Sequence, residues 1–213
     1  METNKEIIAL ATGTILTEAE TLRELAACID EPFAEVVRMI YSSKGRLIVT
    51  GIGKSAIIAQ KIVATLNSTG TPAVFMHAAD AIHGDLGIIL PDDLVLCLSK
   101  SGNTPEIKVL VSIIRAKGNP VIAMVSNLSS YLAGNADKVL FAKAEKEACP
   151  NNLAPTSSTT AQLVMGDALA VCLLKMRGFT PDDFAKVHPG GSLGKKLYTR
   201  VSDVARTDNP PRV

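Results

Sequence analysis

The chain contains no tryptophan, and only three tyrosines, five phenylalanines and three histidines occur among its 213 residues. So few aromatic rings offer little surface on which nucleic-acid bases can stack. An excess of charge of one sign is also missing, because 22 basic residues balance 21 acidic ones and leave a formal net charge of +1. Proteins whose main partner is nucleic acid usually carry a clear excess of basic residues. The composition therefore argues against nucleic-acid binding as the main function.

Cysteine is sparse as well, and the four positions lie far apart, without the paired spacing of a metal site: Cys28, Cys97, Cys149 and Cys172. This pattern is typical of a reducing, cytoplasmic compartment. The N-terminus lacks a basic segment followed by a long apolar run, which argues against a secretory signal. We also find no apolar stretch long enough to span a bilayer. We therefore expect a cytoplasmic protein that does not bind a membrane.

Residues 1–44 are expected to form two helices that belong to the same domain as the rest of the chain. Apolar residues recur at helical spacing over about residues 3–29, and an Asp-Glu-Pro sequence at 30–32 then interrupts the pattern. A second amphipathic pattern follows it. Because both helices precede any strand, their apolar faces need a partner surface on the body of the domain or on another subunit.

From residue 45 onward, short apolar runs alternate with helical patterns that often end in glycine. The runs are RLIVTG, PAVFM, LVLCLS, PVIAMVS and KVLFAK. Alternation of this kind predicts right-handed βαβ units, and hence an α/β protein with a five-stranded parallel sheet in a three-layer α/β/α sandwich. A last long helix is expected over about residues 158–177. In such folds ligands bind beyond the carboxyl ends of the strands.

The third strand run opens into a turn rich in hydroxyl groups, in the sequence LVLCLSKSGNTPEI at residues 94–107. Pro105 suits the first turn of a helix, where its missing N–H costs nothing. Backbone N–H groups of such a turn can bind phosphate at the start of the helix. Serine, asparagine and threonine also cap helices without any ligand, so this stretch alone leaves both explanations open.

Polar residues follow the other strand runs too, and each has a simpler explanation when it is taken alone. The G-x-G-K-S sequence at 51–55 has the glycine spacing of neither a P-loop nor a dinucleotide site. His83 could be a structural histidine, Glu147 a surface carboxylate, and the TSSTT sequence at 156–160 only a helix cap. Because all of them follow strand runs, we expect them to converge at one edge of the sheet. Their convergence favours a site for a phosphorylated small molecule.

The chemistry of this set favours proton transfer. Hydroxyl groups and helix starts would bind phosphate, which leaves carboxylates, a lysine and histidines to act as acids and bases. The sequence suggests no Cys–His nucleophile, and no aspartate cluster that would hold Mg²⁺ for phosphoryl transfer. Proton abstraction next to a carbonyl, through an enediolate, remains. That reaction is aldose–ketose isomerisation, and it needs no cofactor.

Three motifs carry a resemblance to a known family: S-x-S-G-x-T at 99–104, G-x-G-K-S at 51–55 and H-G-D-L-G at 83–87. They resemble the sugar isomerase (SIS) domain, which has a flavodoxin-like fold. Within it, the stretches KEACPNNLAPTSSTTAQLVMGDALA and HPGGSLGKKL resemble the arabinose 5-phosphate isomerases. The resemblance implies interconversion of D-ribulose 5-phosphate and D-arabinose 5-phosphate, which supplies 3-deoxy-D-manno-octulosonate (Kdo) for lipopolysaccharide or capsule. It also implies a homo-oligomer, expected to be a tetramer.

The family's functional positions transfer to this sequence residue by residue. The resemblance implies catalytic roles for Lys54, Glu106, Glu147, His188 and His83. It implies substrate-binding roles, mainly toward phosphate, for Gly53, Ser55, Ser99, Ser101, Gly102, Thr104, Thr156 and Ser157. His188 lies far along the chain and is a candidate to complete the site of a neighbouring subunit. No metal is expected to be required, but Zn²⁺ held by His83 and His188 would inhibit.

One departure from the family concerns the end of the chain. Many relatives continue into a tandem pair of CBS domains, and the TRVSDVARTDNPPRV sequence resembles the entry to that pair. We therefore expect a SIS domain over 45–198 and a polar tail over 199–213 without CBS domains. Feedback would then act on the isomerase domain, and CMP-Kdo, with its phosphate and carboxylate, is the expected ligand.

Two alternatives stay open. The first is an isomerase that acts on another sugar phosphate. The second is a non-catalytic regulator that binds phosphosugars, although residues 1–44 offer neither a third helix nor a basic recognition face.

Overall fold

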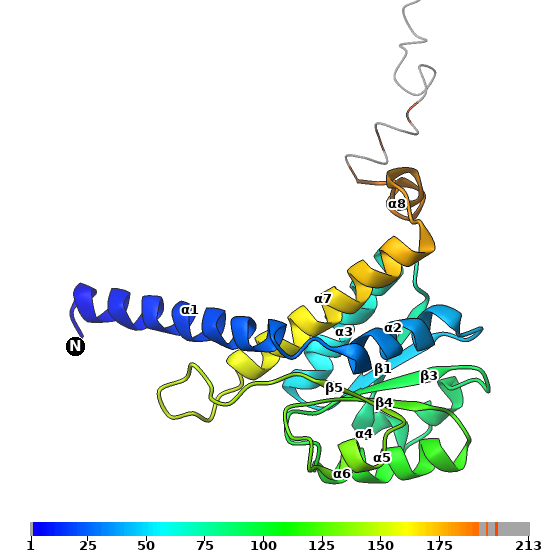
Figure 1. Cartoon of the computed structure of the whole chain (residues 1–213), viewed down its shortest axis with the longest axis horizontal. Helices are drawn as coiled ribbons and strands as arrows, with labels where there is room; N and C mark the ends of the chain where they lie inside the picture. Colours follow the sequence, from blue (N-terminus) through cyan, green and yellow to red (C-terminus); the bar gives the residue numbers. More distant parts are fainter. Residues whose placement is uncertain (1, 192–194, 196–198, 200–213) are drawn as a thin grey trace, which may run out of the picture.

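The computed structural model describes residues 2–191, 195 and 199. Five strands form one parallel sheet in the order β2-β1-β3-β4-β5 (Figure 1). They are β1 (Leu47–Gly51), β2 (Ala73–His77), β3 (Leu94–Leu98), β4 (Val121–Val125) and β5 (Lys138–Phe141). Every residue of β1, β3 and β4 is buried, as expected for continuous apolar runs covered on both faces. The predicted sheet is confirmed.

Helices cover both faces of the sheet and complete the predicted three layers (Figure 1). One face packs against α1 (Asn4–Ala26), α2 (Glu31–Ser42), α3 (Lys54–Ser68) and α7 (Ser157–Arg177). The other packs against α4 (Ala78–Ala81), the 3₁₀ turn η1 (Asp85–Ile88), α5 (Pro105–Ala116) and α6 (Tyr131–Gly134). The short helix α8 (Pro181–Val187) follows α7 and was not predicted from the sequence. The order of the strands reverses between β1 and β3, which marks the expected crevice.

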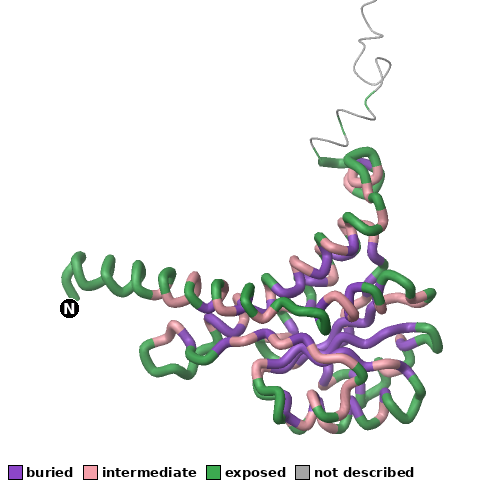
Figure 2. Tube along the Cα trace, in the orientation of Figure 1, coloured by how far each residue is buried: buried purple, intermediate pink, exposed green. Residues whose placement is uncertain are grey.

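The helix α1 extends well beyond the body of the domain (Figures 1 and 2). A capping box between Thr3 and Glu6 fixes its start, and only its second half packs on α7, through Leu25 and its neighbours. The apolar residues of its first half stay exposed: Ile7, Ile8, Leu10, Ile15 and Leu16. This is the unpartnered apolar surface that the sequence pattern indicated.

The helix α7 corrects one expectation drawn from the sequence. By length and composition alone, Ser157–Arg177 is long and apolar enough to cross a membrane. Half of its most apolar window is buried inside the molecule, where α7 contacts α3, α1 and α2. Gly166 permits the close contact with α3, since a Cβ there would lie 2.4 Å from Ile62 Cγ1. These contacts are those of a core helix.

The tail predicted over 199–213 lies, apart from Thr199, outside the described residues.

Candidate functional site

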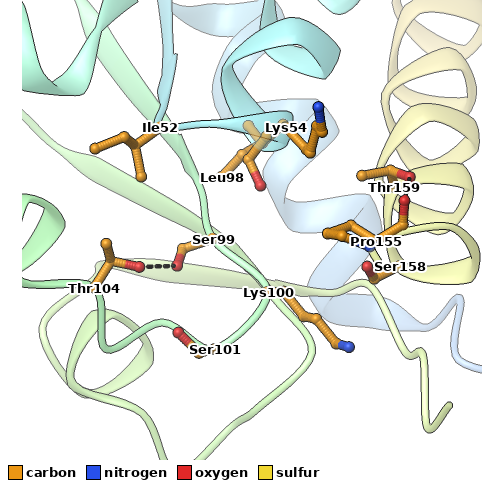
Figure 3. A pocket seen from close by; sticks show the side chains of 11 residues that line it. Ile52, Lys54, Leu98, Ser99, Lys100, Ser101, Thr104, Pro155, Ser158 and Thr159 are labelled. Carbon is orange, nitrogen blue, oxygen red and sulfur yellow. Dashed lines mark hydrogen bonds between the residues drawn. The ribbon is translucent and has the colours of Figure 1, made fainter. Parts of the chain in front are cut away.

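A cavity of about 290 Å³ lies where β1 and β3 end side by side (Figure 3). Ile52 directly follows β1, and Ser99 directly follows β3. The cavity is lined by Ile52, Lys54, Ser55, Leu98, Ser99, Lys100, Ser101, Thr104, Pro155, Ser158 and Thr159. The lining therefore comes from three segments: the start of α3, the turn between β3 and α5, and the start of α7.

The turn between β3 and α5 is folded around the hydroxyl of Ser99. Its Oγ accepts a hydrogen bond from the Gly102 N–H at 3.1 Å and lies 3.3 Å from Thr104 Oγ1 (Figure 3). Gly102 has φ 65°, a left-handed conformation that favours glycine. Within the described part of the chain, the backbone N–H groups of Lys100, Ser101 and Thr104 have no acceptor. The turn thus offers donors to an anion.

Two helices begin at this cavity without a side-chain cap. Thr104 is the N-cap of α5, and its hydroxyl caps no N–H of that helix. Gly53 is the N-cap of α3 and has no side chain with which to cap it. Unpaired N–H groups and the positive end of the helix dipole attract anions, and phosphate above all. Lys54 lies in the first turn of α3 and adds a cation whose side chain has no protein partner among the described residues.

The third helix start is different, because a carboxylate of the protein already occupies it. Oε2 of Glu147 accepts hydrogen bonds from the backbone N–H groups of Thr156 (2.8 Å) and Ser158 (3.1 Å). Oε1 accepts from Ser158 Oγ and Lys100 Nζ, both at 2.5 Å. Glu147 therefore serves as the N-terminal cap of α7, although it precedes Thr156 by nine residues.

The surroundings of Glu147 keep it ionised. The residue is 5 % exposed, and burial on its own would raise the pKa of the carboxyl group. The hydrogen bonds from Lys100, Ser158 and Thr156 outweigh burial and lower the pKa from 4.5 to about 2. A carboxylate held in this way is a poor proton acceptor near neutral pH.

The hydroxyl of Ser55 forms a hydrogen bond with the neighbouring helix α7. Ser55 Oγ donates to Oε1 of Gln162 at 3.1 Å, and Gln162 is buried on α7. This hydrogen bond connects the first turn of α3 with α7 beside the cavity. It keeps a predicted phosphate-binding hydroxyl at a fixed position.

The structure brings most of the predicted binding residues together. Lys54, Ser55, Ser99, Ser101 and Thr104 line the cavity. Gly53 and Gly102 form the turns beside them, and Thr156 supports Glu147 at the start of α7. Ser157 is fully buried and Glu106 is half-buried in the first turn of α5; neither lines the cavity.

The two predicted histidines lie away from the cavity of their own chain. His83 is exposed between α4 and η1. The His188 ring stacks on Phe184 with 3.9 Å between centroids, at the end of α8. Figure 1 shows α8 beyond the C-terminal end of α7, whereas the cavity meets the N-terminal end. One chain does not bring these histidines together, and the described residues contain no cluster of three or more metal-binding side chains.

Sequence reasoning missed several residues of the wall, above all Lys100. Lys100 lies between Ser99 and Ser101, for which the sequence predicts phosphate binding. This position is the sequence signal that could have identified it. Pro155, Ser158 and Thr159 follow the loop after Glu147, and only the course of that loop brings them to the cavity.

Comparison with known proteins identifies relatives over most of the chain. A family model for the SIS domain matches residues 39–172. The arabinose 5-phosphate isomerase KdsD of Pseudomonas aeruginosa is 49% identical over 204 residues, which cover 96% of this chain and 63% of that protein. The arabinose 5-phosphate isomerase KpsF of Escherichia coli is 47% identical over 205 residues, covering 96% and 65%. The chain thus spans a little under two thirds of the length of these relatives.

A solved structure shares the fold over its whole length. It is described as an Escherichia coli CFT073 protein in complex with arabinose 5-phosphate, and it superimposes with a TM-score of 0.86 at 36% sequence identity. The match covers 88% of this chain and 100% of that chain.

Proposed function

The chain belongs to the SIS domain family, and from that premise we propose that it is an isomerase that interconverts D-ribulose 5-phosphate and D-arabinose 5-phosphate. The observation that carries the proposal is the cavity at the ends of β1 and β3, where uncapped helix starts and six hydroxyl-bearing side chains surround one space. The names of the relatives, and the complex of the E. coli protein with arabinose 5-phosphate, support the choice of substrate.

The phosphate of the substrate binds at the turn between β3 and α5. The hydroxyls of Ser101 and Thr104 donate to its oxygens, together with the free N–H groups of the turn. The Ser55 hydroxyl has a single proton, which it donates to Gln162 Oε1, so it would donate to the phosphate in exchange for that bond. Lys54 supplies positive charge from the first turn of α3. The sugar then extends toward the start of α7, where Ser158 and Thr159 line the opposite wall.

Isomerisation moves one carbon-bound proton and one hydroxyl proton. A carboxylate base removes a proton from C1 of ribulose 5-phosphate, and the electron pair forms the enediolate. The same proton, or one from solvent, returns to C2 while the proton on O1 passes to O2, so that the C1 aldehyde of arabinose 5-phosphate results. Both oxygens of Glu147 are occupied by donors, which leaves Glu106 as the candidate base, although Glu106 lies in the first turn of α5 outside the cavity lining and would have to turn toward the substrate. Lys54 stabilises the enediolate charge.

His188 would complete the site from a neighbouring subunit. Within one chain it lies with α8 at the far end of α7, so a second copy is needed to place it near the proton transfer between O1 and O2. The exposed apolar first half of α1 offers a surface for such an assembly, which we take to be a tetramer. His83 would then contact oxygens of the sugar.

The proposed setting is cytoplasmic synthesis of Kdo for lipopolysaccharide or capsule, with no nucleic acid, membrane or cofactor involved. CMP-Kdo remains the proposed feedback ligand, because its phosphate and carboxylate suit the anion-binding turns and Lys54.

A substrate panel tests this function. The purified protein is incubated with ribulose 5-phosphate, ribose 5-phosphate, xylulose 5-phosphate and fructose 6-phosphate, and the products are identified by NMR. Conversion of ribulose 5-phosphate to arabinose 5-phosphate, in preference to the other reactions, supports the proposal. Conversion of another substrate alone would favour a different sugar phosphate isomerase, and binding without conversion would favour a regulator.

A further inference from the structure

Lys100 has no role in the reaction as described so far, yet it occupies the edge of the cavity. Its backbone belongs to the phosphate-binding turn, and its side chain runs toward the start of α7 near Ser158 (Figure 3). Its ammonium group donates to Glu147 Oε1 at 2.5 Å. The Lys100 side chain is 42% exposed and that of Glu147 only 1%, so Lys100 is the exposed member of this ion pair and the one that lines the cavity.

Glu147, in contrast, faces the protein. It does not line the cavity, and its two oxygens accept five hydrogen bonds from Lys100, Thr156 and Ser158. To take a proton from a substrate, this carboxylate would have to give up donors at the first turn of α7. This geometry suits a carboxylate that fixes the positions of Lys100 and the first turn of α7, and not one that takes a proton.

We propose that Glu147 is a positioning residue and that Lys100 is the group it positions against the substrate. Glu147 caps α7 and fixes the Lys100 ammonium at the edge of the cavity, where that ammonium binds an oxygen of the anionic sugar phosphate. An ammonium group has three N–H donors, and the bond to Glu147 leaves two for a ligand. The inference rests on the proposed function, because it needs a sugar phosphate in this cavity.

The ion pair also connects two walls of the site. Lys100 belongs to the turn after β3, whereas Glu147 holds Thr156 and Ser158 at the start of α7. A long lysine side chain loses much rotamer freedom when it binds a ligand. Anchored to Glu147, Lys100 has lost that freedom before the substrate arrives, so its contact with the substrate is preorganised.

The test compares Lys100→Met, Lys100→Arg and a matched control, Lys61→Met. Lys61 forms an ion pair with Asp167 between α3 and α7, is similarly exposed, and does not line the cavity. Calorimetry measures the dissociation constant of arabinose 5-phosphate, and kinetics give KM and kcat for ribulose 5-phosphate. Lys100→Met should weaken binding and raise KM by about tenfold or more, the usual effect of losing a charge-assisted hydrogen bond. Lys100→Arg should recover part of the loss, and Lys61→Met should behave as wild type.

Glu147→Gln separates positioning from proton transfer. As a positioning residue, Glu147 should affect mainly KM and the melting temperature, and the pH profile of kcat should keep both limbs. The double variant Lys100→Met/Glu147→Gln should bind little worse than Lys100→Met alone, because the two residues act as one unit.

Three results would overturn the inference. One is a Lys100→Met enzyme with wild-type affinity and KM. The second is a Glu147→Gln enzyme with normal KM whose kcat falls and whose pH profile loses one limb, since that behaviour belongs to a proton carrier. The third is a wild-type protein that does not bind arabinose 5-phosphate, which would also remove the proposed function. Normal catalysis by wild type and Lys100→Met alike would overturn this inference alone. Lys100 is on a half-exposed loop, so its variants keep the test independent of whether Glu147→Gln folds.

Discussion

Gly102 lies directly against Ser130: a Cβ on Gly102 would be 2.1 Å from Ser130 Oγ and 2.5 Å from its Cβ. The Gly102 carbonyl also accepts a hydrogen bond from the Leu132 N–H at 3.0 Å. The turn between β3 and α5 therefore packs against the start of α6. Its shape depends on a residue without a side chain at this one position.

Replacing Gly102 by alanine should cost more stability than the same change at Gly118. Both glycines have positive φ, but Gly118 has open space where a Cβ would lie. Gly118→Ala should lose about 1–2 kcal/mol through the left-handed backbone alone. Gly102→Ala must also displace Ser130, and it should raise KM because the turn is deformed. Urea unfolding measures the difference, and equal losses in the two variants would show that the contact with Ser130 is unimportant.

The hydroxyls of Ser101 and Thr104 should contribute directly to phosphate binding. Each alanine variant removes one hydrogen bond to a dianion, worth about 1.5–3 kcal/mol, and should therefore weaken substrate binding by roughly tenfold or more. Ser112→Ala is the matched control, since Ser112 is exposed on α5 and bonds to the Lys108 carbonyl outside the cavity. If KM and kcat/KM are unchanged in both variants, the turn does not bind the phosphate.

Glu147 should make the stability of the protein depend on acid pH. Its pKa is about 2 in the folded protein against an ordinary value of 4.5. A lowered folded-state pKa stabilises the fold above pH 4.5, by at most roughly 3 kcal/mol, and this contribution disappears as the pH falls from 4.5 toward 2. Glu147→Gln should thus be less stable than wild type at pH 7, and the difference should shrink below pH 4.5. A difference independent of pH would mean that the charge of Glu147 does not stabilise the fold.

Mixed oligomers should reveal whether subunits share the site. Lys54→Met and His188→Asn should each be inactive, because each removes one of the proposed contributors to the reaction. Subunit exchange between them should restore activity, since hybrid oligomers contain sites with one intact Lys54 and one intact His188 from different chains. Native mass spectrometry confirms that hybrids form. Hybrids without activity, or a wild-type protein that is monomeric by light scattering, would argue against a shared site.

The sheet could be predicted from the sequence because its signals are local. Each strand is a short apolar run. The polar residues that directly follow β1 and β3 in the sequence were predicted to form a site, and they line the cavity. The Lys100–Glu147 pair could not be predicted, since its partners lie 47 residues apart and meet only after the loop before α7 has folded. The helix α8 was missed although Thr180 and Asp183 form a capping box at its start. Composition likewise could not distinguish a core helix such as α7 from a membrane span, because only its packing does so.

The most direct test of the account is to follow ribulose 5-phosphate in D₂O by NMR with the purified protein. Isomerisation through an enediolate predicts that arabinose 5-phosphate forms and carries solvent deuterium at C2, to the extent that the abstracted proton exchanges before its return. Thr104→Ala should form the same product only at higher substrate concentration. If the wild-type protein leaves ribulose 5-phosphate unchanged, with neither product nor deuterium exchange, the central claim is contradicted.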